Sequence, residues 1–295
     1  MDPSWRGQGS RPRLQDERQY RAVVDRYAVI GNPIRHSKSP TIHRSFARDA
    51  GIELEYEVIE CPLDAFVDAV AAFREQGGRG VNVTAPFKLK ALELADQVSG
   101  RVRVAGSVNT LKFEDADVLA DNFDGIGLVT DLQANLGYRI TGRRLLVLGA
   151  GGAARGILEP LVEERPAELV VANRAPERAR KAIESLASQD RVRGGPYDEI
   201  GADAFDLVIN ATSASMHGER PPLPSTAFRP GGLAYDLAYG RGLTPFLEAA
   251  REAGAARIVD GVGMLVEQAA ESFAWWRGIR PPTRAMIAEL TVPLT

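Results

Sequence analysis

The feature that most constrains the fold of this chain is a glycine-rich segment at its middle. Residues 145–155 of the 295 read LLVLGAGGAAR, an apolar strand that runs into a glycine-rich turn and then into a helix. Gly149, Gly151 and Ala154 fit the pattern G-x-G-x-x-G/A, in which glycines let the backbone approach a pyrophosphate at the amino terminus of the helix. Because a dinucleotide-binding unit normally begins with this turn, we expect a separate unit to precede it and to determine substrate specificity. A tight strand-to-helix turn without a ligand is the structural alternative.

Composition and charge exclude several classes of protein. Of the 295 residues, 44% are hydrophobic and 25% are charged, which fits a globular protein with room for two cores. The net charge of -3 and the lack of a sustained Lys/Arg stripe argue against nucleic-acid binding and against binding to an anionic membrane surface. We therefore expect a small-molecule partner.

Cysteine and histidine usage indicates the compartment and argues against a metal. Cys61 is the only cysteine, so no disulfide can form within the chain, and a reducing compartment is the simplest interpretation. His36, His43 and His217 show no metal-ligand spacing. No apolar run reaches the roughly 18 residues that span a bilayer, and the start of the chain lacks the apolar core of a signal peptide, which predicts a cytoplasmic protein. The oligomeric state is left open, a homodimer included.

The residues after the next predicted strand indicate which dinucleotide binds. Asn173 and Arg174 stand where an acidic residue would bind the ribose 2′-hydroxyl of NAD. An arginine favours a 2′-phosphate, and Arg178 offers a second guanidinium one helical turn further on. The pattern predicts NADP in preference to NAD. A solvated arginine at a helix start is the structural alternative, stronger for Arg178 than for Arg174.

Alternating strand and helix patterns from residue 26 onward predict a two-domain α/β fold. We expect residues 26–125 to form a substrate-binding catalytic domain and residues 126–261 to form a doubly wound, Rossmann-like NADP-binding domain. The helices in 262–295 come too late to extend the second sheet, so we expect them to pack back on the first domain and complete it. Residues 1–25 are rich in Arg, Gly, Pro and Gln, which predicts a flexible extension.

Two serines mark a predicted helix start in the first half. Ser39 before Pro40 predicts an N-cap, and Gly51 predicts the end of that helix. Ser37 lies two residues before Ser39, so two hydroxyls and free backbone N–H groups would meet where the helix dipole favours an anion. A substrate carboxylate would suit this position, although capping alone would explain Ser39.

A second predicted helix start and an aspartate suggest proton-transfer chemistry. Thr84 and Pro86 predict a helix with Lys88 in its first turn, where a cation is disfavoured by roughly 0.3 to 1 kcal/mol. A flexible surface lysine is the structural alternative. Asp124 is predicted to cap a helix that begins near Gly125. Lysine and aspartate could also form a proton-transfer pair beside a nicotinamide, but their spacing in the sequence does not decide whether they meet.

Ordered motifs run through the chain from residue 27 to residue 295. They read GNPIRHSKSP, NVTAPFK, GSVNTL, DNFDG, GAGGAARG, ANR, NATS, YDLAY and DGVGMLVEQAA. Their combination resembles the shikimate dehydrogenase family and is far more specific than a glycine turn alone. The resemblance implies that NADPH delivers a hydride to the C3 ketone of 3-dehydroshikimate and gives shikimate, reversibly, in the chorismate pathway to the aromatic amino acids.

The resemblance also implies roles for residues of this chain. Lys88 and Asp124 match the catalytic pair of the family and should also hold the substrate hydroxyls. Ser37 and Ser39 match carboxylate-binding positions. The further substrate contacts that it implies are Thr84, Asn109, Tyr239 and Gln268. The structural alternatives are a turn residue for Asn109, a packed aromatic ring for Tyr239 and an exposed polar helix residue for Gln268.

For the cofactor, the resemblance implies three groups of contacts. The pyrophosphate would lie against Gly149, Ala150, Gly151, Gly152 and Ala153. The adenosine phosphate would lie against the segment 173–178, with Asn173, Arg174 and Arg178. The nicotinamide would lie near Leu237 and Gly261, with Thr212 as a neighbour.

Two positions depart from the pattern of the family. Phe123 stands where a threonine usually precedes the catalytic aspartate, which makes the substrate scope less secure. Ala175 stands where a threonine often follows the Asn-Arg pair, which removes a phosphate hydrogen bond worth about 1 kcal/mol, so we expect a weaker preference for NADP with its sign kept. Two alternatives stay open: a quinate/shikimate dehydrogenase or relative acting on a similar cyclic polyol acid, and a non-catalytic ligand sensor, which predicts a damaged Lys88–Asp124 pair.

Overall fold

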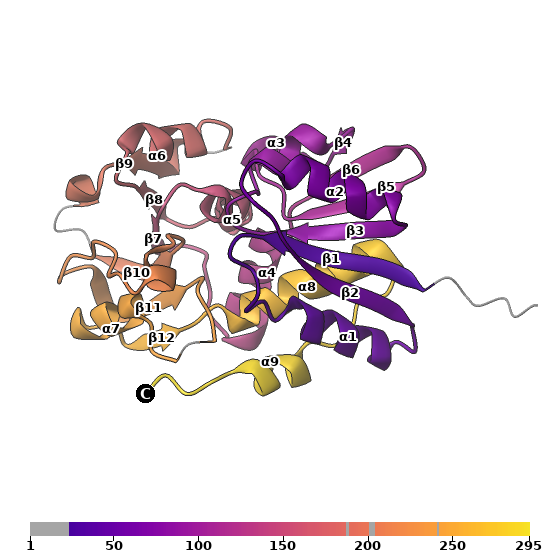
Figure 1. The fold of residues 1–295 in the computed structure, drawn as a ribbon. Coiled ribbons are helices and arrows are strands. Elements are labelled where there is room, and N and C mark those ends of the chain that lie inside the picture. The colour runs from indigo at the N-terminus through magenta and orange to yellow at the C-terminus, as the bar shows by residue number, and fades with distance from the viewer. Residues whose placement is uncertain (1–23, 187–188, 201–203, 241) are drawn as a thin grey trace, which may run out of the picture.

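Two six-stranded sheets lie side by side in the computed structural model (Figure 1). The structure describes residues 24–295 except 187–188, 201–203 and 241. The predicted extension at 1–25 falls almost wholly outside these residues. Asp25 is an exception, because it is the first residue of the first strand. No helix in the described ranges is long and apolar enough to cross a membrane.

The amino-terminal sheet is mixed, with the strand order β2-β1-β3-β5-β6-β4. Strand β1 pairs in parallel with β2 and β3, whereas β5 is antiparallel to both β3 and β6. Its strands are β1 (Asp25–Gly31), β2 (Leu54–Glu60), β3 (Gly78–Val83), β4 (Gln97–Val98), β5 (Thr110–Glu114) and β6 (Asp117–Asp121). The helical segments between them are α1 (Ser39–Asp49), α2 (Phe66–Glu75), the 3₁₀ helix η1 (Lys90–Leu94) and α3 (Gly100–Ala105).

The second sheet is wholly parallel, with the order β12-β11-β10-β7-β8-β9. Its strands are β7 (Arg144–Leu148), β8 (Glu168–Ala172), β9 (Val192–Gly195), β10 (Phe205–Asn210), β11 (Phe228–Asp236) and β12 (Arg257–Val259). The helices are α5 (Gly152–Glu163), α6 (Pro176–Ile183) and α7 (Pro245–Glu252), with 3₁₀ turns η3 (Gln189–Arg191), η4 (Tyr197–Ile200) and η5 (Ala214–His217). This is the doubly wound order that the sequence predicts, and its switch point lies between β7 and β10, where ligands bind at the carboxyl ends of the strands.

Helical segments from the middle and from the end of the chain connect the two sheets. Helix α4 (Asp124–Thr130) continues into a π-helical turn, η2 (Asp131–Asn135). Helix α4 packs against both α5 and α8 (Val262–Arg277), and α8 contacts α1 and α9 (Arg284–Leu290). Buried residues of α1, α8 and α9 form one cluster that includes Ile42, Phe46, Val266, Phe273 and Met286. The carboxy-terminal helices therefore return to the amino-terminal half (Figure 1).

The start of α8 packs closely on the π-helical turn, which makes Gly263 a test of this connection. A Cβ added at Gly263 would overlap the carboxylate of Asp131. That carboxylate is fixed by the Tyr235 hydroxyl at 2.7 Å and by the Asn135 amide at 2.9 Å. We expect Gly263→Ala to lower the free energy of unfolding in urea by roughly 1–3 kcal/mol. Gly100→Ala is the control, because a Cβ there meets nothing within 4 Å, and equal stability of the two variants would contradict this packing.

Candidate active site

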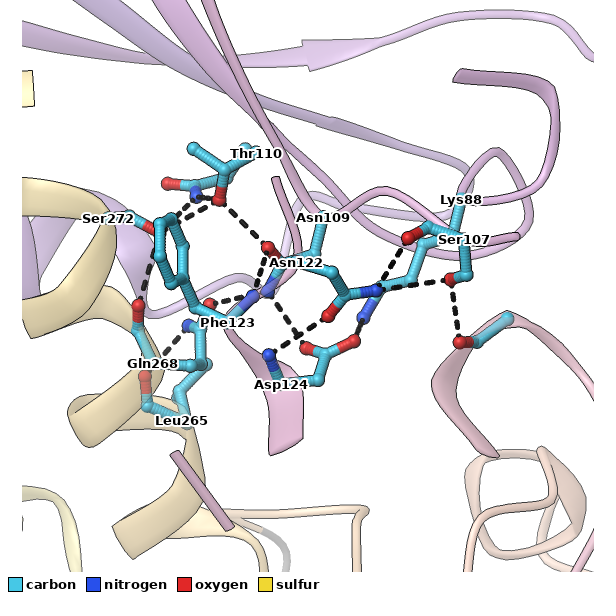
Figure 2. Close-up of polar contacts among 12 residues, drawn as sticks. Lys88, Ser107, Asn109, Thr110, Asn122, Phe123, Asp124, Leu265, Gln268 and Ser272 are labelled. Atoms are coloured by element: carbon cyan, nitrogen blue, oxygen red, sulfur yellow. Dashed lines mark hydrogen bonds and ion pairs between the residues drawn. The ribbon is translucent and has the colours of Figure 1, made fainter. Parts of the chain in front are cut away.

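Lys88 and Asp124 meet in the space between the two sheets (Figure 2). The Lys88 Nζ lies 2.5 Å from Asp124 Oδ2, and the side chains are 13% and 4% exposed. The predicted helix start at Thr84 and Pro86 is wrong: the chain makes turns through Lys88, and the 3₁₀ helix η1 begins only at Lys90. The Lys88 carbonyl accepts from Val108 N at 2.8 Å, so the backbone at Lys88 is held by the segment that leads into β5.

Asp124 does not cap its helix. Helix α4 begins at Asp124 itself, Phe123 takes the N-cap position, and no side chain makes a capping bond there. The backbone N–H of Asp124 donates to Asn122 Oδ1 at 3.0 Å. The carboxylate is therefore engaged elsewhere: Oδ2 binds Lys88 and Oδ1 accepts from Asn109 Nδ2 at 3.0 Å. The capping interpretation is wrong, and the two side chains do pair.

The glycine-rich turn lies directly against this pair. A Cβ added at Gly152 would stand 2.8 Å from the Cβ of Lys88, and one at Gly156 would stand 3.0 Å from Asp124 Oδ2. Ser107 donates from its hydroxyl to the Gly152 carbonyl at 2.8 Å, which ties the amino-terminal half to the turn. The first turn of α5 and the Lys88–Asp124 pair thus face each other across the join between the two sheets.

Helix α8 adds Gln268 to the same group. Asn109 Nδ2 donates to Gln268 Oε1 at 3.2 Å as well as to Asp124. The Gln268 amide in turn donates to the Leu265 carbonyl at 2.8 Å, which fixes its orientation. Asn109, Asp124 and Gln268 come from three different elements and are brought together by the fold, as Figure 2 shows.

A second group of hydroxyls, which we call the serine cluster, comprises Ser37, Ser39, Tyr56 and Tyr239. Ser37 and Ser39 lie 3.2 Å apart between their Oγ atoms. Burial raises the pKa of Tyr56 well above its usual value, and a hydrogen bond from Ser39 opposes this shift. Burial likewise raises the pKa of Tyr239, and its hydrogen bond with Ser37 opposes the shift. Tyr239 follows β11, so both halves of the chain contribute to this cluster.

Ser39 is not the N-cap that the sequence predicted. Helix α1 includes Ser39, and Lys38 holds the cap position without a side-chain bond. The Lys38 carbonyl accepts from Ile42 N at 3.1 Å, which makes it the first helical acceptor. The Ser39 hydroxyl is therefore directed to the serine cluster.

Thr84 lies just after β3, four residues before Lys88, and its backbone N–H donates to the Ile30 carbonyl at 3.0 Å.

The residues predicted to hold the pyrophosphate form a strand-to-helix turn suited to an anion. Gly149 has a φ of +106°, which favours glycine, and a Cβ there would lie 3.0 Å from the Ala211 carbonyl oxygen. Gly151 is the N-cap of α5 and makes no side-chain cap bond, while Gly152, followed by Ala153, opens the helix. The exposed backbone N–H groups and the helix dipole fit a dinucleotide pyrophosphate.

The other residues predicted around the cofactor lie at the carboxyl ends of neighbouring strands. A Cβ at Gly149 would lie 3.2 Å from Thr212 Cγ2, and Gly261 packs on the backbone of Leu237. Arg174 and Arg178 are exposed beside the start of α6, and the Asn173 amide donates to the Ala175 carbonyl at 3.0 Å. Two exposed guanidinium groups at this edge fit a 2′-phosphate. These positions agree with NADP as the dinucleotide.

Several residues that complete the site were missed in the sequence. Ser107 and Asn122 join the glycine turn to Asp124, because Asn122 Nδ2 donates to the Ser107 carbonyl at 2.8 Å. Tyr56 and Asn82 connect the serine cluster to the interior, with 2.6 Å between the Tyr56 hydroxyl and Asn82 Oδ1. Ser107, Asn122 and Asn82 all lie within the motifs that carry the resemblance, but their partners are distant in the sequence.

Phe123 takes a place outside the polar network. Its ring packs edge-on against Trp275 with 5.8 Å between the ring centres, and the Arg101 guanidinium lies 5.3 Å from the ring. Only its backbone N–H joins the network, as a donor to Asn109 Oδ1 at 2.9 Å. The aromatic ring is thus accommodated by packing beside the pair.

Comparisons with known proteins agree over most of the chain. Three family profiles match: the shikimate dehydrogenase substrate binding domain at residues 29–111, shikimate / quinate 5-dehydrogenase at 131–219, and the shikimate 5′-dehydrogenase C-terminal domain at 261–291. The shikimate dehydrogenase (NADP(+)) of Nitrosospira multiformis is 56% identical over 91% of this chain and 98% of its own length. The shikimate dehydrogenase (NADP(+)) of Dechloromonas aromatica is 52% identical, and the match covers 92% of this chain and 99% of that protein.

Solved structures show the same relationship. The Ael1 enzyme from Pseudomonas putida is 55% identical, with a TM-score of 0.83, covering 92% of this chain and 100% of that one. The Thermus thermophilus shikimate 5-dehydrogenase, solved in complex with NADP(H) and shikimate, is 34% identical, with a TM-score of 0.78. The match covers 90% of this chain and 98% of that one. The chain belongs to the shikimate dehydrogenase family.

Proposed function

We propose that this protein is an NADP-dependent shikimate dehydrogenase that interconverts 3-dehydroshikimate and shikimate. The observation that carries the proposal is the buried Lys88–Asp124 pair, held at 2.5 Å and set against the first turn of the dinucleotide-binding helix. Relatives that are 48–56% identical over most of this chain carry the name shikimate dehydrogenase (NADP(+)). The proposed reaction is a step of the chorismate pathway.

Lys88 is the proton donor in the proposed reduction. Bound NADPH supplies the hydride, and the ketone oxygen of the substrate then develops negative charge. The Lys88 ammonium stabilises that charge and transfers a proton to the oxygen, while Asp124 keeps the lysine pointed into the site. Asn109 and Gln268 lie beside Asp124 and can hold the neighbouring hydroxyls of the substrate. Oxidation of shikimate reverses these steps.

The serine cluster is the proposed site for the substrate carboxylate. Ser37, Ser39 and Tyr239 offer hydroxyl donors close together, and Thr84 follows the neighbouring strand.

The proposed substrate-binding domain spans residues 26–125 and is completed by 262–295, and the proposed NADP domain spans 126–261. Cytoplasmic location stays a prediction, as does a homodimer.

Arg174 is the proposed main determinant of NADP preference. A guanidinium that binds the 2′-phosphate contributes to NADP alone, because NAD lacks this group. We expect Arg174→Ala to lower the ratio of kcat/KM for NADP⁺ to that for NAD⁺ by at least about tenfold. Arg180→Ala, which removes an exposed arginine further along α6, is the control and should leave the ratio unchanged. A ratio that Arg174→Ala does not change would rule out this assignment.

Steady-state assays test the function directly. Initial rates are measured with shikimate and with quinate, each with NADP⁺ and with NAD⁺. We expect the highest kcat/KM for shikimate with NADP⁺. A higher value for quinate would support the quinate alternative, for which the profile at 131–219 names both substrates. No turnover with either acid would support the ligand-sensor alternative, against which the intact Lys88–Asp124 pair argues.

A further inference from the structure

A line of buried hydrogen bonds connects the two ends of the candidate active site. It starts at Tyr56 in the serine cluster, passes through Asn82 and Thr110, and ends at Asn109 and Asp124. Thr110 lies at its centre, at the first position of β5, and its side chain is fully buried. Thr110 is not among the residues assigned above to substrate or cofactor.

The direction of the hydrogen bonds is fixed at Asn82. The Tyr56 hydroxyl donates to Asn82 Oδ1 at 2.6 Å, so the Asn82 Nδ2 group faces the other way. It donates to Thr110 Oγ1 at 3.1 Å and to Ser272 Oγ at 3.0 Å. Thr110 Oγ1 accepts from Asn82 and donates its own proton to Asn109 Oδ1, which lies 2.9 Å away. Ser272 Oγ, also 2.9 Å from Thr110 Oγ1, can donate to it.

The same logic fixes the amide of Asn109. Its Oδ1 accepts from Thr110 and from Phe123 N, so its Nδ2 must face Asp124 Oδ1 and Gln268 Oε1. A reversed amide would set its carbonyl oxygen against the Asp124 carboxylate. Asn109 and Asp124 are only 2% and 3% exposed, and in such surroundings an unmatched polar contact is costly.

We propose that Thr110 is a positioning residue of the reaction. Its hydroxyl, together with the backbone N–H of Phe123, fixes the orientation of the Asn109 amide. The amide in turn holds the Asp124 carboxylate, which faces Lys88. Thr110 itself lies one side chain away from the groups that would contact substrate (Figure 2). This inference rests on the proposed function.

Kinetics of three variants of the full chain test this role. Thr110→Val keeps the volume and removes the hydroxyl, and it should lower kcat/KM for shikimate by about tenfold with an unchanged KM for NADP⁺. Thr110→Ser keeps the hydroxyl and should return the value to within about twofold of wild type. Ser272→Ala is the matched control: its hydroxyl is bonded to the same Asn82 and Thr110 and to the backbone carbonyl of Gln268, but not to Asn109, so the activity should stay near wild type. Equal losses in Thr110→Val and Ser272→Ala would overturn the proposal.

A double-mutant cycle tests whether Thr110 acts through Asn109. In an Asn109→Ala background, adding Thr110→Val should change kcat/KM by less than about twofold, because the amide that Thr110 orients is gone. A full tenfold further loss would show that Thr110 acts by another route and would overturn the proposal. Circular dichroism checks that each variant is folded. An inactive wild type would refute the proposed function and with it this role, whereas an active wild type with an unaffected Thr110→Val variant would refute this role alone.

Discussion

Replacing Lys88 with alanine is expected to lower kcat for shikimate oxidation by about 10²- to 10⁴-fold, the range typical of a lost general acid or base. The KM values for shikimate and NADP⁺ should change far less, because the lysine acts mainly on the charge that develops during hydride transfer. Initial rates across a range of both substrates measure the two effects separately.

Two controls support the interpretation of this variant. Lys90→Ala removes a lysine two residues further on, in the 3₁₀ helix η1, and should keep near-normal turnover. Lys88→Ala leaves Asp124 buried without its cation, so its free energy of unfolding must be measured as well. A folded Lys88→Ala variant with near-normal kcat would contradict the assignment of Lys88 as proton donor.

The second large effect is expected at Gly152. An added Cβ would stand 2.8 Å from the Lys88 Cβ and 3.4 Å from the Ser107 hydroxyl, so the glycine turn and Lys88 would have to move apart. A displacement of about 1 Å between reacting groups can cost about 10²-fold in rate, and we expect a loss of this size in kcat for Gly152→Ala. The measurement is kcat at saturating shikimate and NADP⁺.

Gly100→Ala serves as the control for this substitution. It adds the same methyl group at the start of α3, where a Cβ meets nothing within 4 Å, and its kcat should match wild type. Wild-type turnover in Gly152→Ala would mean that the two sheets do not approach each other as described.

Local sequence signals were sufficient for the centre of the second sheet. The apolar strand at 144–148, the glycine turn and the helix that follows each have a strong pattern of their own, and they assemble as predicted. Short elements were missed: β9 reads VRGG, and two glycines with no β-branched run give little strand signal. Strand β6 and helix α3 are short and have a weak periodicity. Helix α7 also went unpredicted, although Thr244 caps it, Pro245 opens it and its buried residues lie on one face.

The site shows where local rules fail. Ser39, Thr84 and Asp124 each follow a helix-start pattern, yet none of them caps a helix. Distant partners engage these residues: the Asp124 carboxylate binds Lys88, the backbone N–H of Thr84 donates to the Ile30 carbonyl, and Ser39 bonds to Tyr56. Such tertiary hydrogen bonds override local propensity, and a single sequence does not contain the pairing.

The resemblance supplied the identities of the site residues, and the structure adds their connections. That Lys88 and Asp124 matter followed from the motifs NVTAPFK and DNFDG. That Asn109 is held by Thr110, and that Ser107 binds the glycine turn, required coordinates. Residues whose role is to orient other residues are difficult to find in a sequence, because a buried Thr or Ser is equally common in an ordinary core.

A crystal structure of the protein with shikimate and NADP⁺ tests the central claim most directly. We expect the reacting hydroxyl of shikimate within hydrogen-bonding distance of Lys88 Nζ, its carboxylate at the serine cluster, and the nicotinamide ring on the side of the glycine turn. Shikimate bound away from the Lys88–Asp124 pair, or a dinucleotide whose nicotinamide points out of the space between the two sheets, would contradict the account.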